Sequence, residues 1–92
     1  MIIYMITNLM DGKVYVGKSR KSFIDFENSS YYGSGIIIKK AIKKYGKECF
    51  ERIILESGIE TEKKLSEREK FWIAEMKSKV EFKEGYNISN GG

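Results

Sequence analysis

The pattern near the start of the chain is two short, mainly apolar runs separated by a polar turn, which is typical of two β-strands. The runs are the segments 2–8 and 13–17, along which successive side chains point to opposite faces of a sheet. Asp11-Gly12 between them is a strong hairpin signal, because both residues tolerate the positive φ that tight turns require. If the loop has an even number of residues, paired positions sum to an odd number, and the two sheet faces are then defined. The predicted faces are Ile2, Tyr4, Ile6 and Tyr15 on one side, and Ile3, Met5, Val14 and Val16 on the other.

The apolar spacing changes to the helical period in the middle of the chain. A segment that starts at Ser34, which can serve as N-cap, and stops at Gly46 has an apolar stripe on one side and lysines on the other. The stripe is Ile37, Ile38, Ala41, Ile42 and Tyr45, and the lysines are Lys39, Lys40, Lys43 and Lys44. Before this helix, the irregular segment 18–33 has room for one short helical turn around 23–26.

Three further segments complete the predicted order of elements. Residues 49–56 form a third strand, a longer helix runs from near Thr61 to about Lys79, and residues 86–92 form an Asn/Gly-rich loop. Two strands, a helix, a strand and a helix predict a small α+β fold. We expect a single domain spanning residues 1–92, and the loop-like tail leaves open that it is the N-terminal part of a longer chain.

One charged residue of the last helix falls on its apolar side. Glu69 lies inside the stripe, whereas Glu67 and Glu75 point away from it. Burying an unpaired carboxylate costs several kcal/mol, so Glu69 needs a partner or a metal ion. The simpler explanations are an ion pair with Arg52 or Arg68, or a stripe edge that reaches water. The stripe is formed by Leu65, Trp72, Ile73 and Met76.

Composition narrows the chemistry that the chain can perform. Its 92 residues allow one domain, and Cys49 is the single cysteine, which excludes an internal disulfide and a thiolate-rich zinc site. Histidine is absent, which excludes histidine bases and histidine-ligated metals. Any catalysis must therefore use tyrosine, carboxylates, basic side chains and a metal bound through oxygen. No segment approaches the roughly 20 apolar residues of a membrane helix, so we expect a cytoplasmic protein.

The net charge of +4 is unevenly distributed. Between residues 13 and 47, nine basic residues stand against two acidic ones, whereas residues 48–84 carry a slight acidic excess. A basic half indicates a polyanionic partner such as DNA, since neutralising phosphates releases counterions. The alternative is a well-solvated lysine face without a partner.

Four sequence blocks together resemble the GIY-YIG nucleases. Ile2-Ile3-Tyr4 followed by Val14-Tyr15-Val16-Gly17 resembles the paired motif that names the family, and residues 35–46 with Phe50 resemble its second helix and third strand. Glu67 to Ile73 is similar to its glutamate-bearing helix, and Gly85-Tyr86-Asn87-Ile88 to its asparagine motif. The resemblance covers nearly the whole chain and is strongest to the catalytic domains of phage homing endonucleases. It implies a small three-stranded antiparallel sheet flanked by helices.

The resemblance also implies an activity and its residues. Tyr4 and Tyr15 would line an active site shaped by Gly17, Glu69 would bind Mg²⁺ or Mn²⁺, and Asn87 would support the site or the substrate backbone. The implied reaction is metal-dependent hydrolysis of DNA phosphodiesters, one strand per active site, in a phage-infected bacterial cell. Tyr4 is the favoured base for activating the attacking water.

The sequence departs from the family pattern at two places. Ile2 replaces the usual first glycine, which concerns packing. The family arginine on the helix after the second motif is Asp25 here, so another cation must meet the scissile phosphate. Arg20 is the first candidate, followed by Lys18, Lys21 and Lys39.

Two other functions stay open on the sequence. The chain could be a catalytically weak or inactive nucleic-acid-binding module with the same fold, or a structural or inhibitory protein whose lysine helix contacts another protein. In the nuclease and in the binding module, Lys18, Lys21, Lys39, Lys40, Lys43 and Lys44 would contact DNA. Target specificity and oligomeric state cannot be read from these residues.

Overall fold

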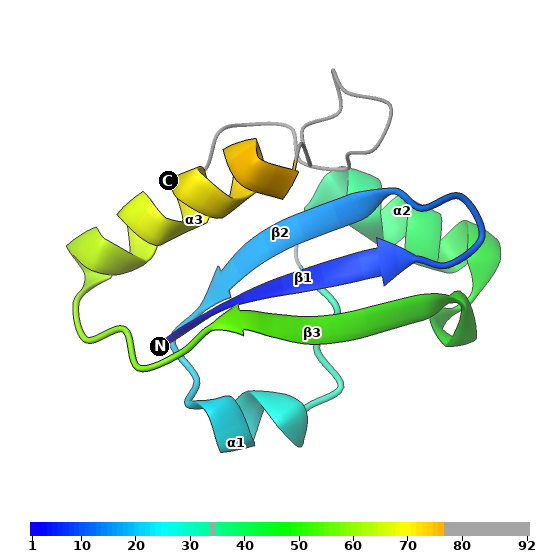
Figure 1. Ribbon diagram of the computed structural model, residues 1–92. Helices are drawn as coiled ribbons and strands as arrows, with labels where there is room; N and C mark the ends of the chain where they lie inside the picture. Colours follow the sequence, from blue (N-terminus) through cyan, green and yellow to red (C-terminus); the bar gives the residue numbers. More distant parts are fainter. Residues whose placement is uncertain (34, 77–92) are drawn as a thin grey trace.

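The computed structural model describes residues 1–33 and 35–76 and shows an α+β fold built on one antiparallel sheet. The sheet has three strands in the order β2-β1-β3, so the first strand is central (Figure 1). The strands are β1 (Ile2–Asn8), β2 (Val14–Ser19) and β3 (Phe50–Glu56). The helices are α1 (Phe23–Glu27), α2 (Ile36–Tyr45) and α3 (Glu62–Met76), with the 3₁₀ turn η1 (Lys47–Cys49) before β3. The predicted fold class is confirmed.

The hairpin has the predicted register. The amide of Asn8 donates to the carbonyl of Lys13 at 2.9 Å, which closes an even loop of residues 9–12. The buried side chain of Asn8 accepts from the amide of Met10, and Gly12 takes the positive φ of 77° that the turn needs. Tyr4 consequently pairs with Gly17 and Ile6 pairs with Tyr15, so the two phenols share one face of the sheet.

Each face of the sheet has its own apolar core. Residues from α1 and α2 cover the face of Tyr4, where Ile2, Ile6, Phe26 and Ile38 are buried. Residues from α3 cover the opposite face, where Ile3, Val16, Leu65 and Ile73 are buried together with Ile59. Figure 1 shows α3 along one side of the sheet and α1 on the other. The hydrophobic effect therefore fixes both faces of β1 and leaves β2 as an edge strand beside α3.

Element boundaries differ from the expectations by one or two residues. The third strand begins at Phe50, because residues 47–49 form the turn η1. Helix α2 begins at Ile36 with Gly35 in the N-cap position, and Ser34, the expected cap, lies outside the described residues. Helix α3 begins at Glu62, and Thr61 caps it by accepting from the amide of Lys64 at 3.1 Å. The expected end of α3 near Lys79 also lies outside the described residues.

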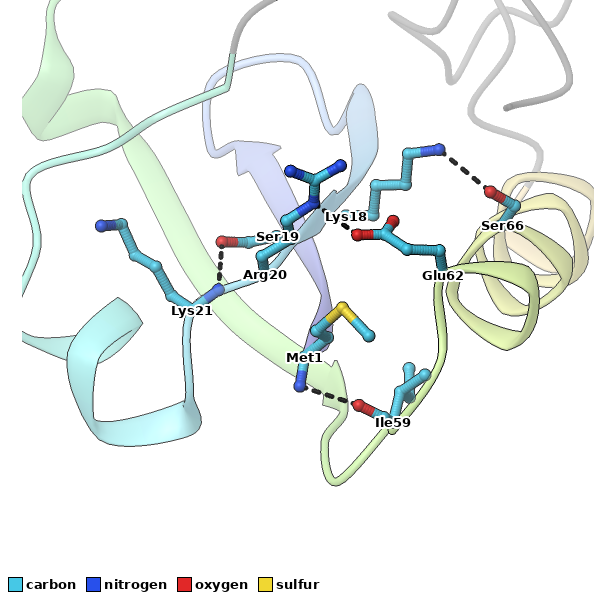
Figure 2. A network of polar contacts seen from close by, with 8 residues as sticks. All are labelled: Met1, Lys18, Ser19, Arg20, Lys21, Ile59, Glu62 and Ser66. Atoms are coloured by element: carbon cyan, nitrogen blue, oxygen red, sulfur yellow. Dashed lines mark hydrogen bonds and ion pairs between the residues drawn. The ribbon is translucent and has the colours of Figure 1, made fainter.

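Two contacts tie α3 and the loop before it to the sheet and the chain start. The N-terminal ammonium of Met1 donates to the carbonyl of Ile59 at 2.9 Å, next to the start of β1 (Figure 2). Trp72 is half-buried rather than central to the stripe, because its Nε1 donates to Glu56 of β3 at 2.9 Å. Within the described part of the chain, no helix is long and apolar enough to cross a membrane.

Candidate active site

Tyr4 lies at the centre of a cluster of aromatic rings. Its side chain is 1% exposed and stacks on Phe26 of α1 with ring centroids 4.8 Å apart. Tyr31 meets the same ring edge-on at 6.0 Å, while Tyr15 lies at 6.3 Å. The predicted pair of phenols is thus brought together, and a third phenol joins it.

Gly17 leaves the space that the ring of Tyr4 fills. A Cβ added at Gly17 would overlap the Cζ and hydroxyl oxygen of Tyr4, because the ring extends from the central strand across β2. The phenol therefore points toward β2, the edge strand of the described sheet. This close approach explains why a glycine stands at position 17, whereas its role in a catalytic site stays a prediction.

Burial of Tyr4 raises the pKa of its phenol far above the usual value near 10. The neighbouring phenols of Tyr15 and Tyr31 and the charge of Glu69 add to this shift. In the protein by itself the hydroxyl consequently keeps its proton well above neutral pH. The effect of Glu69 also shows that its carboxylate and this phenol lie within electrostatic reach of each other.

The raised pKa of Tyr4 predicts a loss of stability in alkali. The folded state disfavours the phenolate, so the contribution of Tyr4 is fully present below about pH 10 and is lost above it. We expect the wild type to lose up to about 1.4 kcal/mol per pH unit more than Tyr4→Phe in that range. Urea unfolding of both proteins from about pH 7 to about pH 11 measures the difference. Parallel stability curves above about pH 10 would contradict the assignment.

Glu69 occupies the predicted place on the apolar side of α3. It is 8% exposed and lies between Leu65 and Ile73 along the helix, each 1% exposed. The alternative that Glu69 is buried because it forms an ion pair with Arg52 or Arg68 is wrong. Arg68 binds Glu56 at 2.8 Å, and Arg52 donates to carbonyl and hydroxyl oxygens on the opposite face of the sheet.

Lys18 is the cation that the described structure places beside Glu69. Its Nζ lies 3.8 Å from Glu69 Oε1, which makes an ion pair but is too long for a hydrogen bond. The same Nζ donates to Ser66 Oγ of α3 at 3.2 Å, as Figure 2 shows. Lys18 alternates with Gly17 along β2 and so faces α3, while the ring of Tyr4 covers Gly17 on the other face.

The other candidate cations lie elsewhere. Arg20 pairs with Glu62 in the first turn of α3, and its side chain is 80% exposed (Figure 2). Lys21 is exposed, and its backbone amide donates to Ser19 Oγ. Lys39 is exposed on α2 together with Lys40, Lys43 and Lys44, opposite the buried Ile38 and Ala41, as predicted. The structure therefore does not bring Arg20 to Glu69.

The remaining predicted site residues are Tyr15, which the structure describes, and Asn87, which it does not. Tyr15 packs against Ile38 and the segment around Gly33 and Gly35, on the side of the sheet that α2 covers. Asn87 lies outside the described residues, so its place in the site stays a prediction.

Sequence reasoning missed three side chains near the site. Tyr31 and Phe26 hold the ring of Tyr4, and Ser66 binds Lys18. The adjacent pair Tyr31-Tyr32 before a glycine could have indicated the contact with Tyr4. Aromatic residues in an irregular segment usually pack against another apolar surface of the protein. Ser66 gave no signal, since a serine on a helix is ordinarily a surface residue.

Glu69 suits a hard divalent cation that keeps most of its own water. The described residues contain no group of three acidic, cysteine or histidine side chains that could hold an ion by themselves. Mg²⁺ commonly uses one or two carboxylates together with substrate phosphate and water. An almost buried carboxylate that faces the edge strand β2 through Lys18 fits that requirement.

Known proteins resemble this chain along nearly its whole length. Residues 1–87 match the family model described as the GIY-YIG catalytic domain. The chain belongs to the GIY-YIG family. A putative endonuclease, segE, of Enterobacteria phage T4 is 38% identical over 98% of this chain, and the intron-associated endonuclease 1 of the same phage is 40% identical over 96%. The chain spans 41% and 36% of the length of these two relatives.

Solved structures share the GIY-YIG fold described above. The catalytic domain of homing endonuclease I-TevI superposes with a TM-score of 0.69 at 36% identity, over 95% of this chain and 96% of that one. A point mutant of the catalytic domain of intron endonuclease I-TevI superposes with a TM-score of 0.73 at 34% identity, over 98% and 94%. The three-stranded sheet flanked by helices is therefore the GIY-YIG architecture, as the resemblance implied.

Proposed function

We propose that this GIY-YIG chain is the catalytic domain of a metal-dependent DNA endonuclease that cuts one strand per active site. The observation that carries the proposal is the place of Glu69. Its nearly buried carboxylate lies within electrostatic reach of the Tyr4 phenol and beside the Lys18 ammonium. The phage T4 relatives named as endonucleases support the activity and a role in the cytoplasm of an infected bacterial cell.

Glu69 would hold the divalent cation, Mg²⁺ or Mn²⁺. When bound, the cation would stabilise charge on the phosphate and the leaving oxygen and lower the pKa of nearby phenols. Glu69 can release Lys18 for this purpose at small cost, because the ion pair is long and Ser66 remains as a partner for Nζ.

Lys18 would then meet a phosphate oxygen of the substrate. It is the described cation that pairs with Glu69, whereas Arg20 pairs with Glu62. An ammonium acts on phosphate as a point charge and needs no planar partner, so a lysine can replace the family arginine in this role. Arg20 stays an alternative that a flexible, exposed side chain allows.

Tyr4 is our candidate for the group that takes a proton from the attacking water. In the protein by itself its phenol is protonated, and burial makes it harder to deprotonate because burial raises its pKa. It can accept a proton only as phenolate, a form that nearby positive charge favours. Tyr15 and Gly17 would shape the pocket around it, and Asn87 would support the site.

The lysine side of α2 would bind the DNA backbone. Replacing Lys39, Lys40, Lys43 and Lys44 by glutamine keeps helix propensity but removes four charges from one face. We expect weaker binding for every DNA sequence, and the slope of log K against log salt should shrink by up to about 3.6. Gel shifts over a salt series measure both effects.

A matched control uses the exposed lysines of α3. Replacing Lys63, Lys64 and Lys70 by glutamine should change the salt dependence less than replacing the α2 lysines. Equal effects of the two sets would show that net charge, rather than the α2 face, determines affinity.

Supercoiled plasmid tests the proposed reaction. The purified chain, with Mg²⁺ or Mn²⁺ added, should convert supercoiled DNA to the nicked circle, and a chelator should stop the conversion. A salt-sensitive gel shift without nicking would favour a binding module. Absence of both would favour a structural or inhibitory protein.

A further inference from the structure

Arg52 gathers one segment of the chain around its guanidinium group. Its Nη1 donates to the carbonyl of Tyr31 at 2.7 Å, and its Nη2 donates to the carbonyl of Ser29 at 2.9 Å. Weaker contacts reach Ser29 Oγ at 3.4 Å and the carbonyl of Glu27 at 3.5 Å. Arg52 lies in β3 opposite Ile6, so it shares the sheet face of Tyr4.

The same guanidinium lies between two aromatic rings. It is 4.8 Å from the centroid of Phe26 and 4.9 Å from that of Tyr32. Phe26 in turn stacks on Tyr4 at 4.8 Å. A layered contact therefore runs from Arg52 through Phe26 to Tyr4, although Arg52 has no contact with the phenol of Tyr4 itself.

The segment that Arg52 binds is the one that positions Tyr4. Phe26 covers one side of the Tyr4 ring, and the ring of Tyr31 meets it edge-on with centroids 6.0 Å apart. Between them the chain is irregular after α1. The amide and the hydroxyl of Ser29 donate to the carbonyl of Phe26, and Lys47 Nζ donates to the carbonyl of Ser30 at 3.1 Å. The amide of Tyr31 has only a 3.4 Å contact with Ser29 Oγ, and Arg52 is the described donor to its carbonyl.

We propose that Arg52 is a positioning residue, which holds residues 26–32 so that Phe26 and Tyr31 keep the phenol of Tyr4 in its place at the active site. The role rests on the proposed nuclease function. This role requires a guanidinium group. Its planar, multi-donor group can donate to two carbonyls in its plane while its faces contact aromatic rings. A lysine would keep the charge and at most one or two of the bonds.

The test compares Arg52→Lys with Arg68→Lys. Arg68 also joins a hydrogen bond, to Glu56 at 2.8 Å, with a ring contact, to Phe71 at 4.3 Å, but neither of these partners touches the ring of Tyr4 in the described part of the chain. We expect Arg52→Lys to lower kcat for plasmid nicking by about tenfold to a hundredfold with KM little changed. Arg68→Lys should leave both constants near the wild-type values.

Amide hydrogen exchange provides a readout that is independent of cleavage. In Arg52→Lys the amides of residues 28–32 should exchange faster, while those of β1 and β2 should not. Tyr31→Ala should lower kcat by itself, and adding it to Arg52→Lys should cause little further loss, because both changes act through the contact of the Tyr31 ring with Tyr4.

Three results would overturn the role of Arg52. Unchanged exchange at residues 28–32 would show that Arg52 does not hold the segment. Faster exchange with normal kcat would make it a purely structural residue, and a raised KM with normal kcat would make it a DNA contact. A wild-type chain that never cuts DNA overturns the nuclease function itself, whereas the exchange comparison still decides whether Arg52 holds the segment.

Discussion

We expect Glu69→Gln to reduce metal-dependent nicking by about 10³-fold or more. The substitution keeps the size of the side chain but removes the negative charge that would hold the divalent cation, and the cation is expected to supply several kcal/mol of transition-state stabilisation. The loss should appear in kcat measured by plasmid nicking over a range of Mg²⁺ concentrations. Binding of DNA should persist in a gel shift, because the basic side chains are unchanged.

The matched control for this prediction is Glu67→Gln. Glu67 belongs to the same helix but is exposed and points away from the apolar side. The Glu67→Gln variant should therefore cut DNA like the wild type. Nicking by Glu69→Gln at the wild-type rate would show that Glu69 is a structural carboxylate that only balances Lys18.

Gly17→Ala should both destabilise the protein and disable it. The new methyl group would overlap the ring of Tyr4. That ring cannot swing aside easily, because Phe26 stacks on it and Tyr31 meets its edge. Overpacking of this kind costs about 1–3 kcal/mol in the free energy of unfolding. Displacement of the phenol should also lower kcat by about a hundredfold, and urea unfolding and plasmid nicking measure the two effects.

A double-mutant cycle tests whether the overlap with Tyr4 causes the loss of stability in Gly17→Ala. If the overlap with Tyr4 is responsible, Gly17→Ala should cost much less stability in a Tyr4→Ala background than in the wild type. Equal costs in the two backgrounds would instead assign the loss to the backbone of β2.

Local pattern predicted most of the secondary structure and the position of Glu69 on its helix. The parity of the hairpin loop placed Tyr4 and Tyr15 on one face, since side chains alternate strictly along a strand. The helical period placed the α2 lysines outward and Glu69 inward, and both are confirmed. These features depend on periods of 2 and 3.6 residues, which a single sequence displays directly.

The cation beside Glu69 could not be chosen by the same reasoning. Lys18 and Arg20 are only two residues apart, at and just beyond the end of β2, and arginine was the better chemical match for the missing family residue. Only the packing of α3 against β2 decides which of them meets Glu69 and which meets Glu62. The offset between a helix and a strand that lie far apart in the sequence leaves no trace in local periodicity.

By itself the sequence determined the order of elements, the sheet faces, the basic face of α2 and the inward carboxylate, because each follows from short-range periodicity and turn chemistry. The tertiary structure alone decided that Tyr4 crosses Gly17, that Lys18 reaches Glu69, and that Arg52 holds the segment carrying Tyr31. Those contacts join residues that are 13 to 51 positions apart. Such distances are set by how the two apolar cores close on the sheet, and the spacing of residues along the chain does not encode them.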